Sequence, residues 1–277
     1  MTITALCRRK VRLYTSERQV VSVPEANQNF SAVARKVDER KKALEMHDMA
    51  LRTLTRKGFL AMLLAGVATG APADEHRLWY RTPAADSIQG WERQSLPIGN
   101  GFFGANVFGN VTNERVQVTH NALHNVDPQN PKKANLTDAL EIRLRTDHRA
   151  VTDYARGLDF ASAVAWVEYA ADGVRYRREF FASYPDRVLV MRLTASEKGR
   201  LSFALDPVAP FLRPGRRTAV RTVRDGVVGV YQELADFAIR FDAELAVVTD
   251  GQVSSDRLSV TGATEAPVMA AFASNYR

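Results

Sequence analysis

The sequence contains one cysteine, Cys7, so the rest of the chain has neither a disulfide nor a thiolate metal site. The four histidines after residue 73 do not fall in a zinc-binding spacing. The sequence also lacks a phosphate-binding G-x-x-x-x-G-K-S/T motif, a dinucleotide fingerprint and a Ser-His-Asp motif. We therefore expect no metal, no cofactor and no nucleotide site.

Residues 74–277, which are most of the chain, carry no formal net charge. The protein carries 38 Lys and Arg against 31 Asp and Glu, but residues 1–73 hold 13 basic and 6 acidic residues. Residues 74–277 therefore hold 25 of each sign. Because a basic surface is the electrostatic signature of nucleic-acid binding, we expect residues 74–277 to bind no nucleic acid.

Residues 49–73 have the features of a signal peptide. A basic segment precedes the apolar run Gly58–Ala68, and Ala71-Pro-Ala73 is a small-residue cleavage site. The pattern predicts cleavage between Ala73 and Asp74 and export to the periplasm or the medium, by a route that resembles a weakened twin-arginine signal. The apolar run is shorter than the roughly 20 residues of a membrane span, so we expect no membrane attachment after cleavage.

Residues 1–48 form a second, separate part of the leader. Ser22-Val-Pro-Glu25 is a capping box, and apolar residues at three- and four-residue spacing follow it, which predicts an amphipathic helix. Residues 21–39 resemble the opening of Phd-type antitoxins, which are DNA-binding proteins. The alternative, which we favour, is a fused or mis-assigned start, with translation beginning at Met46 or Met49.

From Asp74 onward the apolar residues alternate with polar or small ones, as in half-buried strands. Asp-Gly pairs at residues 172, 225 and 250 predict two-residue hairpin turns. Prolines predict loops at Val126–Ala134 and Asp206–Arg217. The predicted fold class for residues 74–277 is all-β, an antiparallel β-sandwich. The alternating pairs are Val174/Tyr176, Leu189/Met191/Leu193, Leu201/Phe203/Leu205, Ile239/Phe241 and Leu258/Val260.

The stretch Leu96–Asn110 has four glycines interleaved with large apolar residues. Glycine permits positive φ and close backbone approach, and the apolar residues between the glycines are suited to burial. The stretch predicts a tight turn, a buried strand and a second turn at Gly109-Asn110.

Together with Arg77-Leu-Trp-Tyr80 and Asn113-Glu-Arg-Val-Gln-Val118, this stretch resembles the N-terminal domain of glycoside hydrolase family 95, the α-L-fucosidase and α-L-galactosidase family. Segments 151–159, 172–186 and 190–203 agree with that family in the same order. The resemblance implies a super-β-sandwich joined by a linker to an (α/α)6 barrel that holds the catalytic residues. It carries no catalytic residue onto this chain, which we predict to be a truncated gene product lacking that barrel.

The predicted loop Thr119–Asn130 supplies the carbohydrate-binding candidates His120, Asn121 and His124, whose side chains can hydrogen-bond sugar hydroxyls. The family usually has Asn-Glu-Asp-Thr-Leu-Trp here, and the alternative is that these residues only cap turns. Trp91 is a further candidate expected at the surface, whereas Trp166 lies on an alternating strand and is expected in the core.

Carboxylates that could act as a catalytic pair have simpler interpretations as turn formers or solvent-facing strand residues. Glu168 and Glu179 are expected to pair with arginines on a sheet face. Whether the chain is an enzyme is therefore left open. The leading hypothesis is the non-catalytic sandwich of an exported α-L-fucosidase-like hydrolase; the alternative is a free-standing carbohydrate-binding module. The candidate carboxylates are Asp127, Asp153, Asp159, Glu168 and Glu179.

Overall fold

A computed structural model of the protein describes residues 76–125, 135–224, 226–235, 238–254 and 257–276. The predicted leader helix, signal peptide and cleavage site lie outside these residues, as does the loop predicted at Val126–Ala134. Within the described ranges, no helix is both long and apolar enough to cross a membrane.

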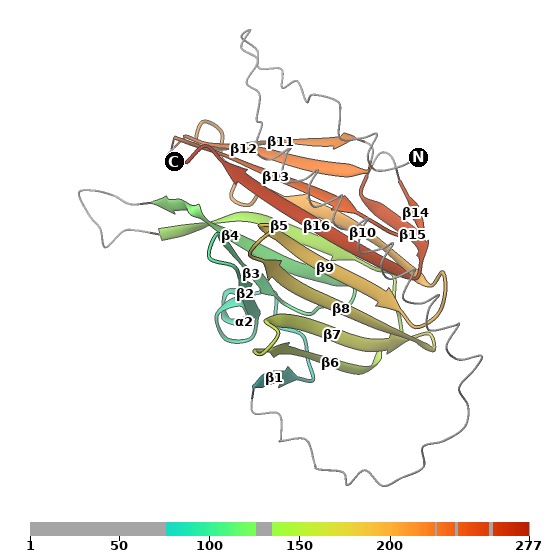
Figure 1. The fold of residues 1–277 in the computed structure, drawn as a ribbon. Coiled ribbons are helices and arrows are strands. Elements are labelled where there is room, and N and C mark those ends of the chain that lie inside the picture. The colour runs from blue at the N-terminus through green and yellow to red at the C-terminus, as the bar shows by residue number, and fades with distance from the viewer. Residues whose placement is uncertain (1–75, 126–134, 225, 236–237, 255–256, 277) are drawn as a thin grey trace. The chain divides into compact units, whose positions relative to one another are not determined.

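Two antiparallel sheets form the sandwich, which confirms the predicted all-β class (Figure 1). The nine-stranded sheet has, in spatial order, β1 (Arg77–Tyr80), β6 (Thr152–Asp159), β7 (Val164–Ala171), β8 (Val174–Ser183), β9 (Val188–Ala195), β16 (Glu265–Ser274), β13 (Ile239–Val247), β12 (Val227–Leu234) and β11 (Arg217–Arg224). The seven-stranded sheet has β14 (Gln252–Val253), β15 (Ser259–Ala263), β10 (Leu201–Val208), β5 (Asn135–Arg145), β4 (Asn113–Asn125), β3 (Phe103–Val107) and β2 (Leu96–Gly99).

The core lies between the inner faces of the two sheets. Val167, Phe180 and Met191 from the nine-stranded sheet belong to one apolar cluster with Val116 and Ile142 from the seven-stranded sheet, and all five are buried. Along β7 the inward residues alternate with half-buried outward ones. The period-two pattern in the sequence therefore reports a real division between an inner and an outer face.

The glycine-rich stretch folds as predicted. β2 and β3 form a hairpin in which Gly99 pairs with Gly104, and the Asn100 side chain accepts hydrogen bonds from the backbone N–H groups of Phe102 and Phe103. Gly109 then turns the chain with a φ of 84°. One short helix, α2 (Ile88–Arg93), precedes this hairpin and was not predicted.

Two of the three predicted Asp-Gly hairpins are present. Asp172-Gly173 joins β7 to β8 with both residues at positive φ, and the pairing of Arg224 with Val227 encloses the second turn. The hairpin predicted at Asp250-Gly251 is wrong, because this turn carries the chain from β13 in one sheet to β14 in the other. The Asp250 side chain accepts backbone hydrogen bonds from Thr264 and Glu265 instead.

Two predicted loops are also corrected, and the one at Asp206–Arg217 is shorter than predicted because only residues 209–216 connect β10 to β11. β10 continues through Pro207 to Val208. Proline is tolerated there because β15 pairs with β10 only as far as Ala204, so the missing N–H of Pro207 removes no hydrogen bond to β15. The segment from Thr119 to Asn125 belongs to strand β4 and pairs irregularly with β5. Ala122 and Leu123 within it are buried, and this burial keeps the segment in the sheet.

Candidate functional site

The outer face of the nine-stranded sheet carries a row of residues that are direct cross-strand neighbours. Trp79 on β1 pairs with Gly157 on β6, Gly157 pairs with Trp166 on β7, and Trp166 pairs with Glu179 on β8. Residues paired in this way project from the same face of a sheet. Two of the three tryptophans of the chain are therefore held two strands apart on one surface.

Trp166 lies on this outer face, so the core position predicted for it is wrong. On β7 the inward positions are taken by Ala165, Val167 and Tyr169, which leaves Trp166 half-buried beside the outward Glu168. The hydrophobicity of tryptophan does not decide the matter, because its side chain can cover one face and leave the other open.

Gly157 makes room for the Trp166 indole. A Cβ atom added at residue 157 would lie 2.7 Å from Cζ2 and 2.8 Å from Cε2 of Trp166, and 2.3 Å from the carbonyl oxygen of Leu78. The indole therefore leans over the glycine toward β1, in space that any other residue would fill. On the far side, 53% of the Trp79 side chain is exposed.

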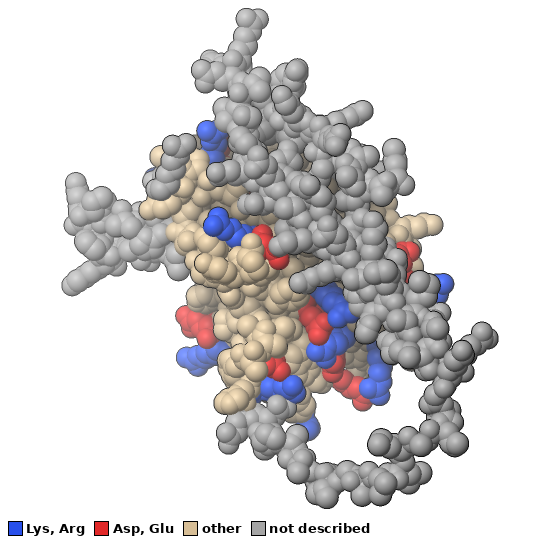
Figure 2. All heavy atoms as spheres, in the orientation of Figure 1, with Lys and Arg blue, Asp and Glu red and all other residues tan. Residues whose placement is uncertain are grey.

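Charged side chains surround the tryptophans in a connected series of ion pairs. Arg177 pairs with Glu168 and, at 2.9 Å, with Glu179, which confirms the pairing expected for both glutamates. Arg192 links Glu179 to Glu265 on β16. Burial lowers the pKa of the Arg177 guanidinium, but its hydrogen bonds to Glu179 and Glu168 outweigh burial and raise this pKa overall. Figure 2, in the orientation of Figure 1, shows positive and negative side chains interleaved over β6–β9.

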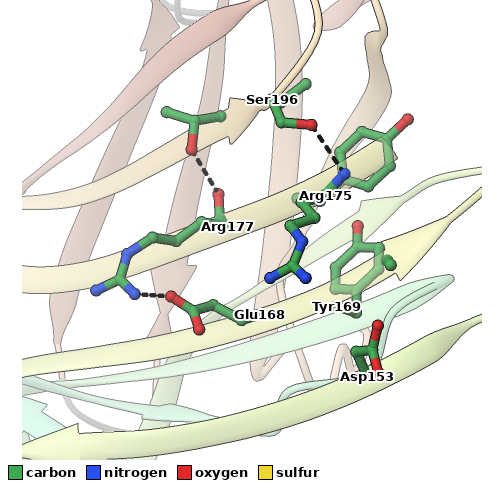
Figure 3. A pocket seen from close by; sticks show the side chains of 10 residues that line it. Asp153, Glu168, Tyr169, Arg175, Arg177 and Ser196 are labelled. Atoms are coloured by element: carbon green, nitrogen blue, oxygen red, sulfur yellow. Dashed lines mark hydrogen bonds and ion pairs between the residues drawn. The ribbon is translucent and has the colours of Figure 1, made fainter. Parts of the chain in front are cut away.

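Two adjoining hollows occupy this face, with volumes of about 820 and 280 Å³. They share Glu168 and Arg177, and we call them together the outer-face groove. Figure 3 shows the smaller hollow, where Arg177 reaches toward Glu168. The larger hollow is lined by Arg77, Trp79, Asp159, Ser162, Val164, Trp166, Glu168, Arg177 and Glu179, and the smaller by Asp153, Glu168, Tyr169, Ala170, Arg175, Tyr176, Arg177, Thr194, Ala195 and Ser196.

The groove combines aromatic surface with closely spaced hydrogen-bonding groups. Arg77 and Asp159, which pair across β1 and β6 two positions from Trp79, form an ion pair of 2.9 Å. Guanidinium groups donate hydrogen bonds and carboxylates accept them. The arrangement suits a molecule that has flat apolar faces and many hydroxyl groups on its edges.

The residues predicted from sequence to bind carbohydrate lie elsewhere. Trp91 is on α2 and is 38% exposed, in agreement with its predicted surface position. His120 and Asn121 are on β4 in the other sheet. His120 packs edge-on against Phe241 at 5.4 Å between ring centroids, and burial lowers its pKa to about 4. Asn121 is exposed and donates to the carbonyl oxygen of Gly101. His124 is on β4, opposite Leu136.

One carboxylate is fully buried between the sheets. Glu114 accepts hydrogen bonds from the backbone N–H groups of Gly109, at 2.7 Å, and Arg115, and its other oxygen lies 3.8 Å from the guanidinium of Arg178. Burial raises the pKa of Glu114 to about 7, and the charge of Arg178 opposes that rise. Because Glu114 has no exposed surface, it holds the fold and does not meet a substrate.

Within the described ranges, no group of three or more His, Cys, Asp and Glu side chains is placed to hold a metal ion.

The residues of the outer-face groove are hard to identify from the sequence. From the sequence, Trp79 is included only as part of a family segment, and Arg177 is not singled out among the arginines expected to pair with the glutamates. The sequence alone does not give the register between strands. This register places Trp79 and Trp166, which are 87 positions apart in sequence, on either side of Gly157.

Comparison with known proteins gives the family. The model of the family described as glycosyl hydrolase family 65, N-terminal domain, matches residues 78–145 and 139–277. The chain is 29% identical over 147 residues to Alpha-L-fucosidase 2 of Arabidopsis thaliana, which covers 39% of this chain and 17% of that protein. A solved structure of a human-microbiome protein assigned as a kojibiose phosphorylase aligns with a TM-score of 0.48 and 10% identity, over 73% of this chain and 32% of that one.

The chain therefore spans only a small part of the length of the relatives it matches. The family match confirms the predicted N-terminal domain of a glycoside hydrolase, although the matching model is that of family 65 and not of family 95. Because the family model matches well over half of the chain, the chain belongs to the family described as glycosyl hydrolase family 65, N-terminal domain.

Proposed function

We propose that this chain is the non-catalytic N-terminal β-sandwich of an exported glycoside hydrolase that acts on α-L-fucosyl groups of glycans. The observation that carries the proposal is the 29% identity to Alpha-L-fucosidase 2. The sequence segments that resemble family 95 support the same substrate class. Its partner in this proposal is an (α/α)6 barrel domain, which supplies the catalytic residues.

The ion pairs of the outer-face groove support a non-catalytic role. Glycoside hydrolysis requires two carboxyl groups, one of which donates a proton to the leaving oxygen. Here Asp159 pairs with Arg77, whereas Glu168 and Glu179 both pair with Arg177. The backbone N–H of Ser162 and the guanidinium of Arg77 lower the pKa of Asp159, so this carboxyl group is a poor proton donor. Glu114 is buried away from any substrate.

Hydrolysis of an aryl α-L-fucoside tests the non-catalytic assignment. The purified 277-residue chain is expected to release no aryl alcohol above the rate of a buffer blank. Release that follows the protein concentration would overturn the assignment and would direct attention to Asp159, Glu168 and Glu179.

The genomic sequence beyond the codon for Arg277 tests the hydrolase part. A reading frame for a helical barrel downstream, in frame or one shift away, would support the proposal. If barrel sequence is absent there, and no separately encoded barrel restores fucoside hydrolysis, the hydrolase assignment fails.

A second candidate is a module that binds carbohydrate without hydrolysing it. The outer-face groove favours it, because aromatic and hydrogen-bonding groups lie together on an accessible surface. The two candidates differ in whether fucoside hydrolysis appears when a barrel domain is supplied.

A further inference from the structure

We propose that the outer-face groove is a binding site for a neutral oligosaccharide, with Trp79 and Trp166 as the surfaces on which sugar rings stack. This site goes beyond the proposed hydrolase assignment and does not depend on it; it specifies the ligand class and the stacking residues of the second candidate. It requires no catalytic domain, and its evidence is the geometry of β1, β6, β7 and β8.

The spacing of the two tryptophans matches an extended ligand. They are paired through Gly157 and therefore lie two strands apart, which at the usual strand separation is about 10 Å. A pyranose ring has an apolar face made of C–H groups, and an aromatic ring offers such a face a large rigid contact at low entropic cost. Two stacking surfaces this far apart suit separate rings of one chain, so we expect an oligosaccharide to bind better than a monosaccharide.

Gly157 explains why the Trp166 surface is available. The strand between the two tryptophans has no side chain at this point, and a Cβ there would lie within 2.8 Å of the Trp166 ring. The Trp166 indole thus lies over the backbone of Gly157, on the side of β7 that faces β1. A larger residue would push Trp166 away from Trp79 and would fill the path between them.

The polar groups are already held in place. Arg177 is fixed between Glu168 and Glu179, and Glu179 is also held by Arg192. Each of these groups keeps unused donor or acceptor capacity, because a guanidinium has five N–H groups and a carboxylate accepts at both oxygens. Side chains that are ordered before binding lose less entropy when hydroxyl groups dock on them.

The charge of the groove predicts the class of sugar. Three positively charged and four negatively charged side chains line the two hollows. A bound carboxylate or sulfate would therefore meet a slight excess of negative charge at short range. Neutral sugars avoid this cost. The charged lining residues are Arg77, Arg175, Arg177, Asp153, Asp159, Glu168 and Glu179.

The same face could instead be covered by another protein domain. Interface cores are depleted of charged residues, whereas this surface carries ion pairs on every strand from β6 to β9. The composition therefore favours a hydrated sugar ligand over a domain contact, and the experiment below separates the two.

Isothermal titration calorimetry on the full chain tests the site. The probes are fucosyllactose, lactose as the matched sugar without fucose, and trigalacturonic acid as an acidic sugar of similar size. The variants are Trp79→Ala and Trp166→Ala. Phe211→Ala is the control because it removes an exposed aromatic side chain in the loop between β10 and β11, outside the groove. Urea unfolding of each variant verifies that it is folded.

We expect a neutral sugar to bind, and each groove variant to weaken binding about tenfold while the control leaves it unchanged. Binding of lactose and fucosyllactose alike would support the site and would leave the fucoside assignment to the barrel experiment. The proposal is overturned if no neutral sugar binds at millimolar concentration, if trigalacturonic acid binds more tightly, or if Phe211→Ala weakens binding as much as the groove variants do. It is also overturned if the groove variants leave sugar binding unchanged but weaken association with a barrel domain.

Discussion

The buried Glu114 should make the stability of the domain depend on pH in a way that one substitution removes. Its side chain has no exposed surface, and its Oε1 atom accepts backbone hydrogen bonds from Gly109 and Arg115. The Oε2 atom has no hydrogen-bond partner among the described residues and lies 3.8 Å from Arg178. Glu114→Gln keeps the shape and an accepting oxygen but removes the titration.

The size and direction of the effect follow from the pKa. Burial raises the pKa of Glu114 from 4.5 to about 7, so the folded state binds this proton more tightly than the unfolded state. Its contribution is fully present below pH 4.5 and is lost as the pH rises to about 7. At 1.36 kcal/mol per pKa unit the loss is about 3 kcal/mol. The pKa of the buried Tyr154 and Tyr169 is also raised, so neither phenol titrates in this window.

Urea unfolding between pH 4.5 and 8 measures the effect. Every other titrating group is common to the two proteins, so the difference between their free energies of unfolding isolates Glu114. We expect the wild type to lose about 3 kcal/mol relative to Glu114→Gln over this range. As a second variant, Arg178→Met leaves the carboxylate without its partner and should cost about 3–5 kcal/mol at pH 8, and less at pH 5. Parallel pH profiles for the wild type and Glu114→Gln would refute this account of the buried pair.

Four further outcomes are expected. Gly157→Ala should lower the free energy of unfolding in urea by about 1–3 kcal/mol, because its Cβ overlaps Leu78 and Trp166; an unchanged value would mean that β1 is not held as described. Gly173→Ala has open space around it but a φ of 81°, so only backbone strain of about 1–2 kcal/mol should appear in the same assay, and no loss would contradict the turn geometry. The ring protons of His120 should not shift in NMR spectra between pH 8 and 5.5, since burial lowers its pKa to about 4; a midpoint near 6.5 would place the ring in solvent. Mass spectrometry of the exported protein should find Asp74 at its N-terminus, and retention in the cytoplasm would contradict the signal-peptide prediction.

The backbone plan of the sandwich could be predicted because it depends on local signals. Alternation gives the strands their two faces, and Asp172-Gly173 forms the turn that its positive φ angles favour. The β2–β3 hairpin around Asn100 could be predicted from sequence for the same reason. Asp250-Gly251 shows the limit of such signals, since an identical dipeptide here connects two sheets. Which strand comes next in space depends on long-range pairing that a dipeptide does not encode.

The outer-face groove could not be predicted because two arginines reverse the usual pattern. Arg156 and Arg178 point inward and are almost completely buried, although arginine normally marks a solvent-facing position. Trp166 points outward, although it is the largest apolar residue of its strand. The face on which each side chain lies was therefore least predictable on β6–β8, where the groove is found.

The inward arginines explain how those strands can carry a polar outer face without losing stability. Arg156 donates to the carbonyl oxygens of Thr82 and Gln94, and Arg178 donates to those of Asn110 and Val111. These carbonyls flank α2 and the β2–β3 hairpin, so the inner face of β6 and β8 fastens that whole segment to the nine-stranded sheet.

The two faces of the same strands thus have separate tasks. Substitutions at Trp79, Trp166 or Arg177 remove groups that contact the outer groove and leave the buried bonds of Arg156 and Arg178 intact. Residues that are far apart and share no partner contribute to stability almost additively. Trp79→Ala, which removes a residue that is 53% exposed, should therefore lose sugar binding and still unfold at a urea concentration closer to that of the wild type than Arg178→Met does. That contrast separates loss of a binding site from loss of the fold that presents it.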